Sequence, residues 1–320
     1  MKLIIQIPCY NEEKTLPAVI ADLPKKIDNI TEIETLIIDD GSTDRTSEVA
    51  KKLGVNHIIR FRRNKGLANG FRAGLDACLK YGADIIVNTD ADNQYCGGDI
   101  ARLVEPIAKG YADMVVGVRP IDSIKDFSWI KKKLQKFGSF VVRIFSRTEV
   151  PDATSGFRAF SKEAALQINV FSEYTYTLET LIQAGEKKLK LIYVPIRVNV
   201  KTRESRLFKS IPAYISRSIT TLIRVSVLYR PLKYFLYIGS SIFFIGTLLG
   251  LRFIYFYLTG SGGGHIQSLI LASVFLTLGF QLIMFALLAD VVATVRKLSE
   301  DIQVRVRRIE LNTQNNKNDN

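Results

Sequence analysis

Residues 84–95, with the sequence DIIVNTDADNQY, place a short apolar run directly before two aspartates that are separated by one residue. Similar apolar, β-rich runs occur at 3–7, 34–39, 57–60 and 114–118. Helical patterns lie between these runs, at 14–23, 43–53, 66–81 and 99–109. The alternation predicts an α/β fold built on a doubly wound, mostly parallel sheet.

Polar clusters follow three of the predicted strands, at 8–12 (PCYNE), 39–42 (DDGS) and 90–92 (DAD). Ligands bind such sheets outside the carboxyl ends of the strands, so the three loops are expected to form one crevice. The DGST segment that starts at Asp40 is also consistent with a simple turn and helix cap. Two carboxylates as close as Asp90 and Asp92 repel each other unless a cation lies between them. This pair therefore predicts a site for a divalent cation that is shared with diphosphate oxygens.

Several classes of protein are disfavoured by what the chain lacks. It has only two histidines, and its cysteines, Cys9, Cys78 and Cys96, have no paired zinc spacing. Neither the dinucleotide fingerprint GxGxxG nor the phosphate loop GxxxxGK[ST] occurs. The net charge of +13 is uneven, because residues 201–320 hold 15 basic and 6 acidic residues. We therefore expect a basic collar around a membrane segment rather than a nucleic-acid-binding face.

Two long apolar runs near the C-terminus predict a transmembrane hairpin, with helices at 234–258 and 266–293. Each run exceeds the roughly 20 residues that a helix needs to cross a bilayer. Basic residues flank the pair on both sides, so the positive-inside rule places both flanks in the cytoplasm. An amphipathic juxtamembrane helix is expected over 204–233, and a basic and then disordered tail over 294–320. Packing between such hairpins would also favour a homo-oligomer.

The motifs resemble a known family when they are read in order. IPCYNEEKTL (7–16), IIDDGSTDRT (37–46), NKGLANGFRAGL (64–75), DADNQY (90–95) and SGFRAFSKEA (155–164) are similar to those of family 2 glycosyltransferases of the GT-A fold. The resemblance is strongest to the polyprenyl-phosphate glycosyltransferase and dolichol-phosphate mannose synthase-like branch. It implies that residues 1–203 form a GT-A catalytic domain.

The resemblance also implies roles for individual residues. Those expected to contact the nucleotide-sugar are Pro8, Tyr10, Glu12, Ile37, Asp39, Asp90 and Ala91. Those expected to hold the metal are Asp90, Asp92 and Gln94, and the catalytic pair would be Asp92 and Arg119. Those expected to bind the acceptor or the donor diphosphate are Arg119, Arg158, Arg203 and Arg206. For Arg158 a structural role is equally open.

The predicted function is metal-dependent, inverting transfer of one sugar from a nucleotide-sugar to a polyprenyl phosphate at the cytoplasmic face of the membrane. UDP-glucose is favoured as donor, and GDP-mannose remains an alternative. A phosphate acceptor is already ionised and needs no general base, which suits motifs without histidine. The alternatives are a glycan acceptor, a processive synthase, a nucleotidyltransferase that releases pyrophosphate, and a non-catalytic membrane scaffold. The processive synthase is disfavoured because its QxxRW element is missing.

Overall fold

The structure is a computed structural model that describes residues 1–120, 129–171, 175–199, 220, 224, 227–260 and 262–318. The chain divides into two compact units, one formed by Met1–Leu222 with Val304–Asn320 and the other by Ile223–Gln303. Arg203, Arg206 and most of the predicted juxtamembrane region lie outside the described residues.

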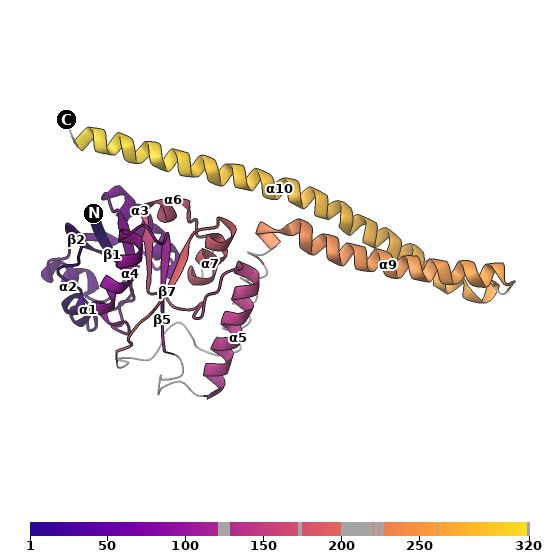
Figure 1. Cartoon of the computed structure of the whole chain (residues 1–320), viewed down its shortest axis with the longest axis horizontal. Helices are drawn as coiled ribbons and strands as arrows, with labels where there is room; N and C mark the ends of the chain where they lie inside the picture. Colours follow the sequence, from indigo (N-terminus) through magenta and orange to yellow (C-terminus); the bar gives the residue numbers. More distant parts are fainter. Residues whose placement is uncertain are drawn as a thin grey trace. The chain divides into compact units, whose positions relative to one another are not determined.

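A mixed sheet of seven strands forms the centre of the first unit (Figure 1). The strands are β1 (Lys2–Cys9), β2 (Glu32–Asp39), β3 (His57–Arg60), β4 (Ile85–Asn88), β5 (Met114–Val118), β6 (Arg158–Ser161) and β7 (Leu191–Pro195). Their order across the sheet is β3-β2-β1-β4-β6-β5-β7. Only β6 runs antiparallel to its neighbours, β4 and β5. The predicted doubly wound, mostly parallel GT-A-like sheet is therefore confirmed.

Helices cover both faces of this sheet. The helices of this unit are α1 (Leu16–Asp22), α2 (Thr46–Lys52), α3 (Leu67–Lys80), α4 (Ile100–Ala108), α5 (Trp129–Ser146), α6 (Lys162–Gln167) and α7 (Thr177–Glu186), with a 3-10 turn, η1 (Gly97–Asp99). Of these, α5 packs against α7. Leu3, Ile5 and Ile7 of β1 share a core with residues of α1 and α4. The opposite face of β1 and β2 lies under α3, where a Cβ on Gly74 would come within 2.9 Å of Ile38 Cδ1. Glycine thus allows α3 to approach the sheet closely.

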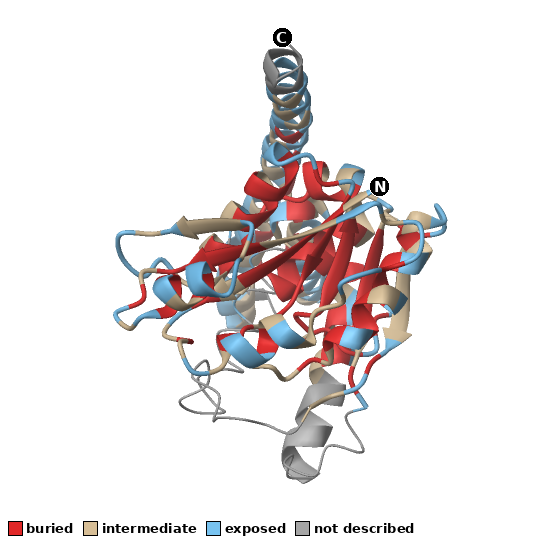
Figure 2. Ribbon diagram, turned by 90° about the vertical axis from the view of Figure 1, so that its left-hand side faces the viewer, coloured by how far each residue is buried: buried red, intermediate tan, exposed pale blue. Residues whose placement is uncertain are grey.

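The core follows from strands that are apolar on both faces. Leu3, Ile4 and Ile5 are all fully buried, as a parallel strand covered by helices on each side requires. Figure 2 shows the buried residues concentrated in the strands and in the helix surfaces that face them. This rigid sheet carries the loops that follow β1, β2 and β4.

The second unit is a helical hairpin of α9 (Pro231–Leu258) and the first part of α10 (Ile266–Asn318), joined through a 3-10 turn, η3 (Gly262–His265). Both helices are long and apolar enough to cross a membrane, and their most apolar 18-residue stretches have mean hydropathies of 1.7 in α9 and 2.3 in α10. Gly246 of α9 packs so tightly that a Cβ would lie 2.8 Å from the Leu276 amide nitrogen of α10. Gly246 therefore allows α9 and α10 to pack closely in the hairpin.

The observed elements differ from expectation in several places. Strands β6 and β7 and helices α6 and α7 were not among the predicted elements. Helix α10 continues to Asn318, whereas a basic and then disordered tail was expected over 294–320. Apolar residues recur along this part of α10 at helical spacing, at Leu298, Ile302, Val306 and Ile309.

Candidate active site

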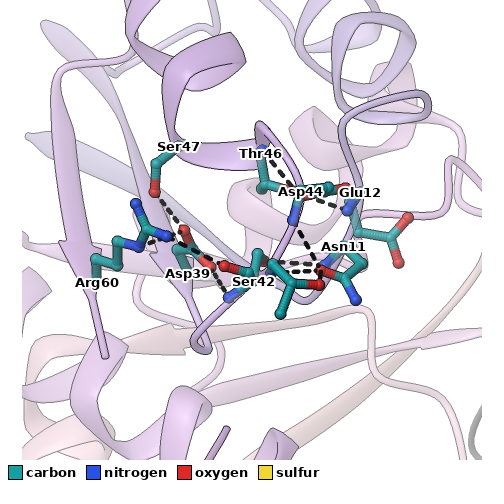
Figure 3. A network of polar contacts seen from close by, with 9 residues as sticks. Asn11, Glu12, Asp39, Ser42, Asp44, Thr46, Ser47 and Arg60 are labelled. Atoms are coloured by element: carbon teal, nitrogen blue, oxygen red, sulfur yellow. Dashed lines mark hydrogen bonds and ion pairs between the residues drawn. The ribbon is translucent and has the colours of Figure 1, made fainter. Parts of the chain in front are cut away.

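The loops after β1 and β2 meet at the carboxyl edge of the sheet (Figure 3). The register of the two strands pairs Cys9 with Asp39, so both loops leave the sheet side by side. The Asn11 amide donates to Ser42 Oγ at 2.9 Å, and Asn11 Oδ1 accepts from the Thr43 amide at 2.8 Å. The Glu12 amide donates to Thr46 Oγ1 at 2.9 Å. These contacts tie the two predicted nucleotide-binding loops into one surface.

Asp39 ends β2 and is fully buried. Its Oδ1 accepts from the Ser42 amide at 2.8 Å, and its Oδ2 accepts from Ser47 Oγ. Arg60 Nε lies 3.5 Å from the same Oδ2 (Figure 3). Because these groups hold the carboxylate, Asp39 shapes the loop that would face a nucleotide.

The neighbouring Asp40 anchors the loop that precedes α3. Its carboxylate accepts from the amides of Lys65 and Gly66 at 2.7 and 2.9 Å. Burial raises the pKa of Asp40, although the two amide donors partly offset that rise. The DGST segment is therefore more than an isolated turn, because it joins β2 to the start of α3.

The other predicted nucleotide contacts differ in their exposure. Tyr10 is exposed and Pro8 is half-buried, so both are accessible at the strand edge. Glu12 is buried, and its Oε2 accepts from Thr15 Oγ1 at 2.6 Å. Ile37 is fully buried in the core with residues of β1 and α1, where its side chain supports the strand.

Asp90 and Asp92 follow β4 at the same edge of the sheet and are half-buried. The Gln94 amide donates to Asp92 Oδ1 at 3.1 Å, which fixes a tight turn in which Asn93 has a φ of 57°. Ala91, between the two carboxylates, is buried. Asn199 holds this loop, because its amide donates to Gln94 O at 2.9 Å and its side chain donates to Asn93 O at 3.1 Å.

The chemistry of this pair suits a hard divalent cation. Mg²⁺ and Mn²⁺ prefer carboxylate oxygens, and Mg²⁺ usually keeps waters and substrate phosphate oxygens in its other positions. Within the described residues, no group of three or more Asp, Glu, His or Cys side chains gathers. Asp90 and Asp92, on one short loop, supply the carboxylate oxygens that such an ion uses when phosphate oxygens of a substrate complete its coordination.

A buried polar network lies beside Asp90. Gln6 Nε2 donates to Asn88 Oδ1 at 2.9 Å, and Asn88 Nδ2 donates to both Gly156 O (2.9 Å) and Tyr176 Oη (2.8 Å). The Gly156 amide in turn donates to Tyr95 Oη at 3.0 Å. Burial, and then the negative charge of Asp90, raise the pKa values of Tyr95 and Tyr176 above their ordinary values. Both phenols are therefore neutral hydrogen-bonding groups at physiological pH.

Arg119 follows β5 and is paired with Asp152. Its Nε and Nη2 donate to the two carboxylate oxygens at 2.7 and 2.9 Å, and Nη2 also donates to Thr154 Oγ1 at 2.6 Å. Burial alone would raise the pKa of Asp152, but the charge of Arg119 lowers it below its ordinary value. Arg119 is only 8% exposed, so its orientation is set by this pair.

Arg158 is fully buried at the start of β6. Its guanidinium donates to three backbone oxygens, Ser155 O at 2.8 Å, Thr177 O at 2.7 Å and Ala153 O at 3.0 Å. It also donates to Thr180 Oγ1 at 2.5 Å. Of the two roles left open by the sequence, this geometry favours the structural one, in which Arg158 joins the 153–155 loop to α7.

Sequence reasoning did not single out Asn88, Asp152, Gly156 or Tyr176. Gly156 lay within the SGFRAF motif, but the reason for a glycine there appears only when Tyr176 and Asp90 are seen beside it. Asp152 was detectable only as the carboxylate that a buried Arg119 requires.

Comparison with known proteins agrees with this geometry. The sequence model of the family described as Glycosyl transferase family 2 matches residues 4–168. A UDP-N-acetylglucosamine--dolichyl-phosphate N-acetylglucosaminyltransferase of Methanococcus voltae is 35% identical over 217 residues, covering 60% of this chain and 83% of the relative. A polyprenol monophosphomannose synthase of Mycolicibacterium smegmatis is 25% identical over 206 residues, covering 61% and 76%.

A solved structure resembles the fold. It is glucosyl-3-phosphoglycerate synthase from Mycobacterium tuberculosis in complex with Mn²⁺, UDP and glucosyl-3-phosphoglycerate. The match has a TM-score of 0.54 and 18% identity, and it covers 71% of this chain and 78% of that one. At this identity the likeness supports the sheet and its helices.

Proposed function

The chain belongs to glycosyl transferase family 2 and is a glycosyltransferase, and from this premise we propose that it transfers one sugar from a nucleotide-sugar to a polyprenyl phosphate. The observation that carries the proposal is the pair Asp90 and Asp92 at the carboxyl edge of the sheet, next to the linked loops after β1 and β2. The long apolar helices α9 and α10 support a lipid acceptor. The two relatives described above are named for dolichyl phosphate and polyprenol substrates, which also favours this acceptor.

The donor would lie across the edge of the sheet. The linked loops around Asn11 and Asp39 would hold the nucleoside, and Tyr10 and Pro8 would lie along it. Asp90 and Asp92, with Gln94 as a further candidate, would hold a Mg²⁺ or Mn²⁺ ion at the diphosphate. That ion, when bound, would supply the positive charge that stabilises the departing nucleoside diphosphate.

The acceptor oxygen would attack the anomeric carbon from the side opposite the leaving diphosphate, with inversion. A lipid phosphate is ionised at neutral pH, so the step needs no side chain to remove a proton. This matters because His57 begins β3 at the opposite edge of the sheet and is hydrogen-bonded to Glu34 at 2.9 Å. Arg119, held by Asp152, is the candidate cation beside the reacting phosphates, and Arg203 and Arg206 keep the roles proposed from the motif.

The membrane arrangement is part of the same proposal. We propose that α9 and α10 span the bilayer as a hairpin and that the catalytic domain and both termini lie on the cytoplasmic side. UDP-glucose is our first candidate, and UDP-N-acetylglucosamine and GDP-mannose belong in the same panel because the relatives named above use different sugars.

A transfer assay tests the proposal. The full chain in detergent or liposomes is given undecaprenyl or dolichyl phosphate, a divalent ion and a panel of labelled UDP- and GDP-sugars. The expected result is organic-phase label with release of nucleoside diphosphate, both abolished by EDTA. Asp92→Asn should lose this transfer, whereas Asp28→Asn, which changes an exposed aspartate far along the chain from the motif, should retain it.

The other outcomes discriminate among the alternatives. Nucleotide release without labelled lipid would refute the lipid acceptor and favour a glycan. Release of pyrophosphate would indicate a nucleotidyltransferase. No turnover with any donor would favour a membrane scaffold with a transferase-like domain.

A further inference from the structure

Two side chains from separate parts of the chain converge at Gly156. A Cβ built on this residue would lie 2.7 Å from Tyr176 Oη and 3.1 and 3.2 Å from the two carboxylate oxygens of Asp90. Carbon atoms do not approach polar atoms as closely as 2.7 Å without displacing them. Residue 156 must therefore be glycine if Tyr176 and Asp90 are to keep these positions.

Tyr176 itself is held on several sides. It is buried, and its ring stacks on Phe71 with centroids 3.9 Å apart and planes 3° apart. Its hydroxyl donates to Gly156 O at 3.3 Å and accepts from Asn88 Nδ2 at 2.8 Å. A rigid hydroxyl thus closes the space next to the Asp90 carboxylate.

The backbone amide and the backbone carbonyl of Gly156 both make hydrogen bonds within the network beside Asp90. Its amide donates to Tyr95 Oη, and its carbonyl accepts from Asn88. Tyr95 belongs to the loop that carries Asp92, and Asn88 ends the strand that leads to Asp90. The backbone at Gly156 therefore joins both sides of the Asp90-Ala91-Asp92 segment.

We propose that Gly156 and Tyr176 are positioning residues, which hold the Asp90 carboxylate in the orientation needed to bind a divalent cation without contacting the cation or the donor themselves. The proposal rests on the proposed function, because that function makes Asp90 a metal ligand. It adds to that function two residues that set the geometry of the ligand. Partners that orient a metal ligand commonly affect metal affinity by about 10- to 100-fold.

Mn²⁺ binding tests this proposal without relying on turnover. Free Mn²⁺ is measured by electron paramagnetic resonance while it is titrated into the full chain in detergent, with and without UDP. Gly156→Ala is expected to weaken binding by about 100-fold and Tyr176→Phe by about 10-fold. The double variant should bind more tightly than Gly156→Ala, because removing the hydroxyl removes the closest clash. Gly138→Ala is the matched control, since a Cβ there has no atom within 4 Å.

The possible outcomes distinguish a failure of the positioning role from a failure of the proposed function. If the wild-type chain binds no Mn²⁺ with UDP present, the metal site of the proposed function fails. If the wild type binds Mn²⁺ and Tyr176→Phe has the same affinity, or the double variant is no tighter than Gly156→Ala, the positioning role is overturned. Thermal unfolding of each variant checks folding, and Tyr176→Phe decides the matter if Gly156→Ala does not fold. Weaker Mn²⁺ binding by variants that are still folded at the titration temperature is the expected signature.

Discussion

Replacement of Arg158 by methionine distinguishes a structural role from acceptor binding. Methionine keeps an apolar side chain of similar length but cannot donate hydrogen bonds. Burial lowers the pKa of Arg158 to about 10, so the wild-type group is still charged at neutral pH and needs its donors to be satisfied. Arg158→Met would leave the carbonyls of Ser155 and Ala153 without this donor in a buried place.

The magnitude follows from these lost contacts. Each buried acceptor without a partner costs about 1–3 kcal/mol, and the variant no longer buries a charge, which offsets part of the loss. A net loss of about 3 kcal/mol in the free energy of unfolding is expected. For a domain of this size, that corresponds to a fall of about 6–12 °C in the unfolding temperature.

The assay is differential scanning calorimetry of the full chain in detergent, together with the KM for polyprenyl phosphate at a temperature where both proteins are folded. Arg62→Met is the matched control, because Arg62 is exposed. It should unfold at the wild-type temperature. An unchanged unfolding temperature for Arg158→Met, together with a higher KM for the lipid, would refute the structural role and restore Arg158 as an acceptor-binding residue.

Three further predictions concern other contacts. The pKa of Asp152 is lower in the folded chain than its ordinary 3.8, so its ionised carboxylate stabilises the fold above about pH 4, and this stabilisation is lost as the pH falls through the folded pKa. Between pH 6 and 3, calorimetry should therefore find a smaller fall in unfolding temperature for Asp152→Asn than for the wild type. Parallel curves of unfolding temperature against pH would contradict this. Gly246→Ala should destabilise the α9–α10 hairpin, whereas Gly250→Ala, whose Cβ would lie 3.9 Å from Ala272 Cβ, should not; equal thermal unfolding of the two variants would argue against the packing. Asn199→Ala removes the side-chain hydrogen bonds to the loop after Asp92, which contribute about 1 kcal/mol each. The KM for the donor should therefore rise about fivefold or more. An unchanged KM would show that Asn199 does not hold this loop for donor binding.

The sequence predicted the parts of the fold that depend on local pattern. The apolar runs at 3–7, 34–39 and 84–88 became β1, β2 and β4, because both faces of these strands are buried and the pattern needs no tertiary information. β6 escaped prediction because it begins with a charged side chain, ends with a serine and has only two apolar residues between them. That Arg158 is nevertheless buried depends on carbonyls from α7 and the 153–155 loop, which no local pattern reveals.

In the candidate site, too, some features could be predicted from the sequence and others could not. The positions of Asp39, Asp90 and Asp92 at strand ends follow from the topology of a doubly wound sheet. Their surroundings do not, since Ser47 lies in α2 and Tyr176 directly precedes α7, which the strand pattern does not reveal. Ile37 illustrates the difference, because it lies two residues before Asp39 but faces the core.

The distribution of charge at the sheet edge explains why a divalent ion and an anionic acceptor belong together in the proposed reaction. Asp39 and Asp152 are each paired with an arginine, Arg60 and Arg119 respectively, so these two carboxylates are neutralised within the protein. Asp90 and Asp92 come from the same short loop, and their charge opposes the approach of a diphosphate. A bound cation would neutralise that local charge, so donor binding and leaving-group stabilisation would depend on the same two carboxylates. The acceptor phosphate would then meet less electrostatic repulsion at the site, and because it is already ionised it would act as the nucleophile without a general base.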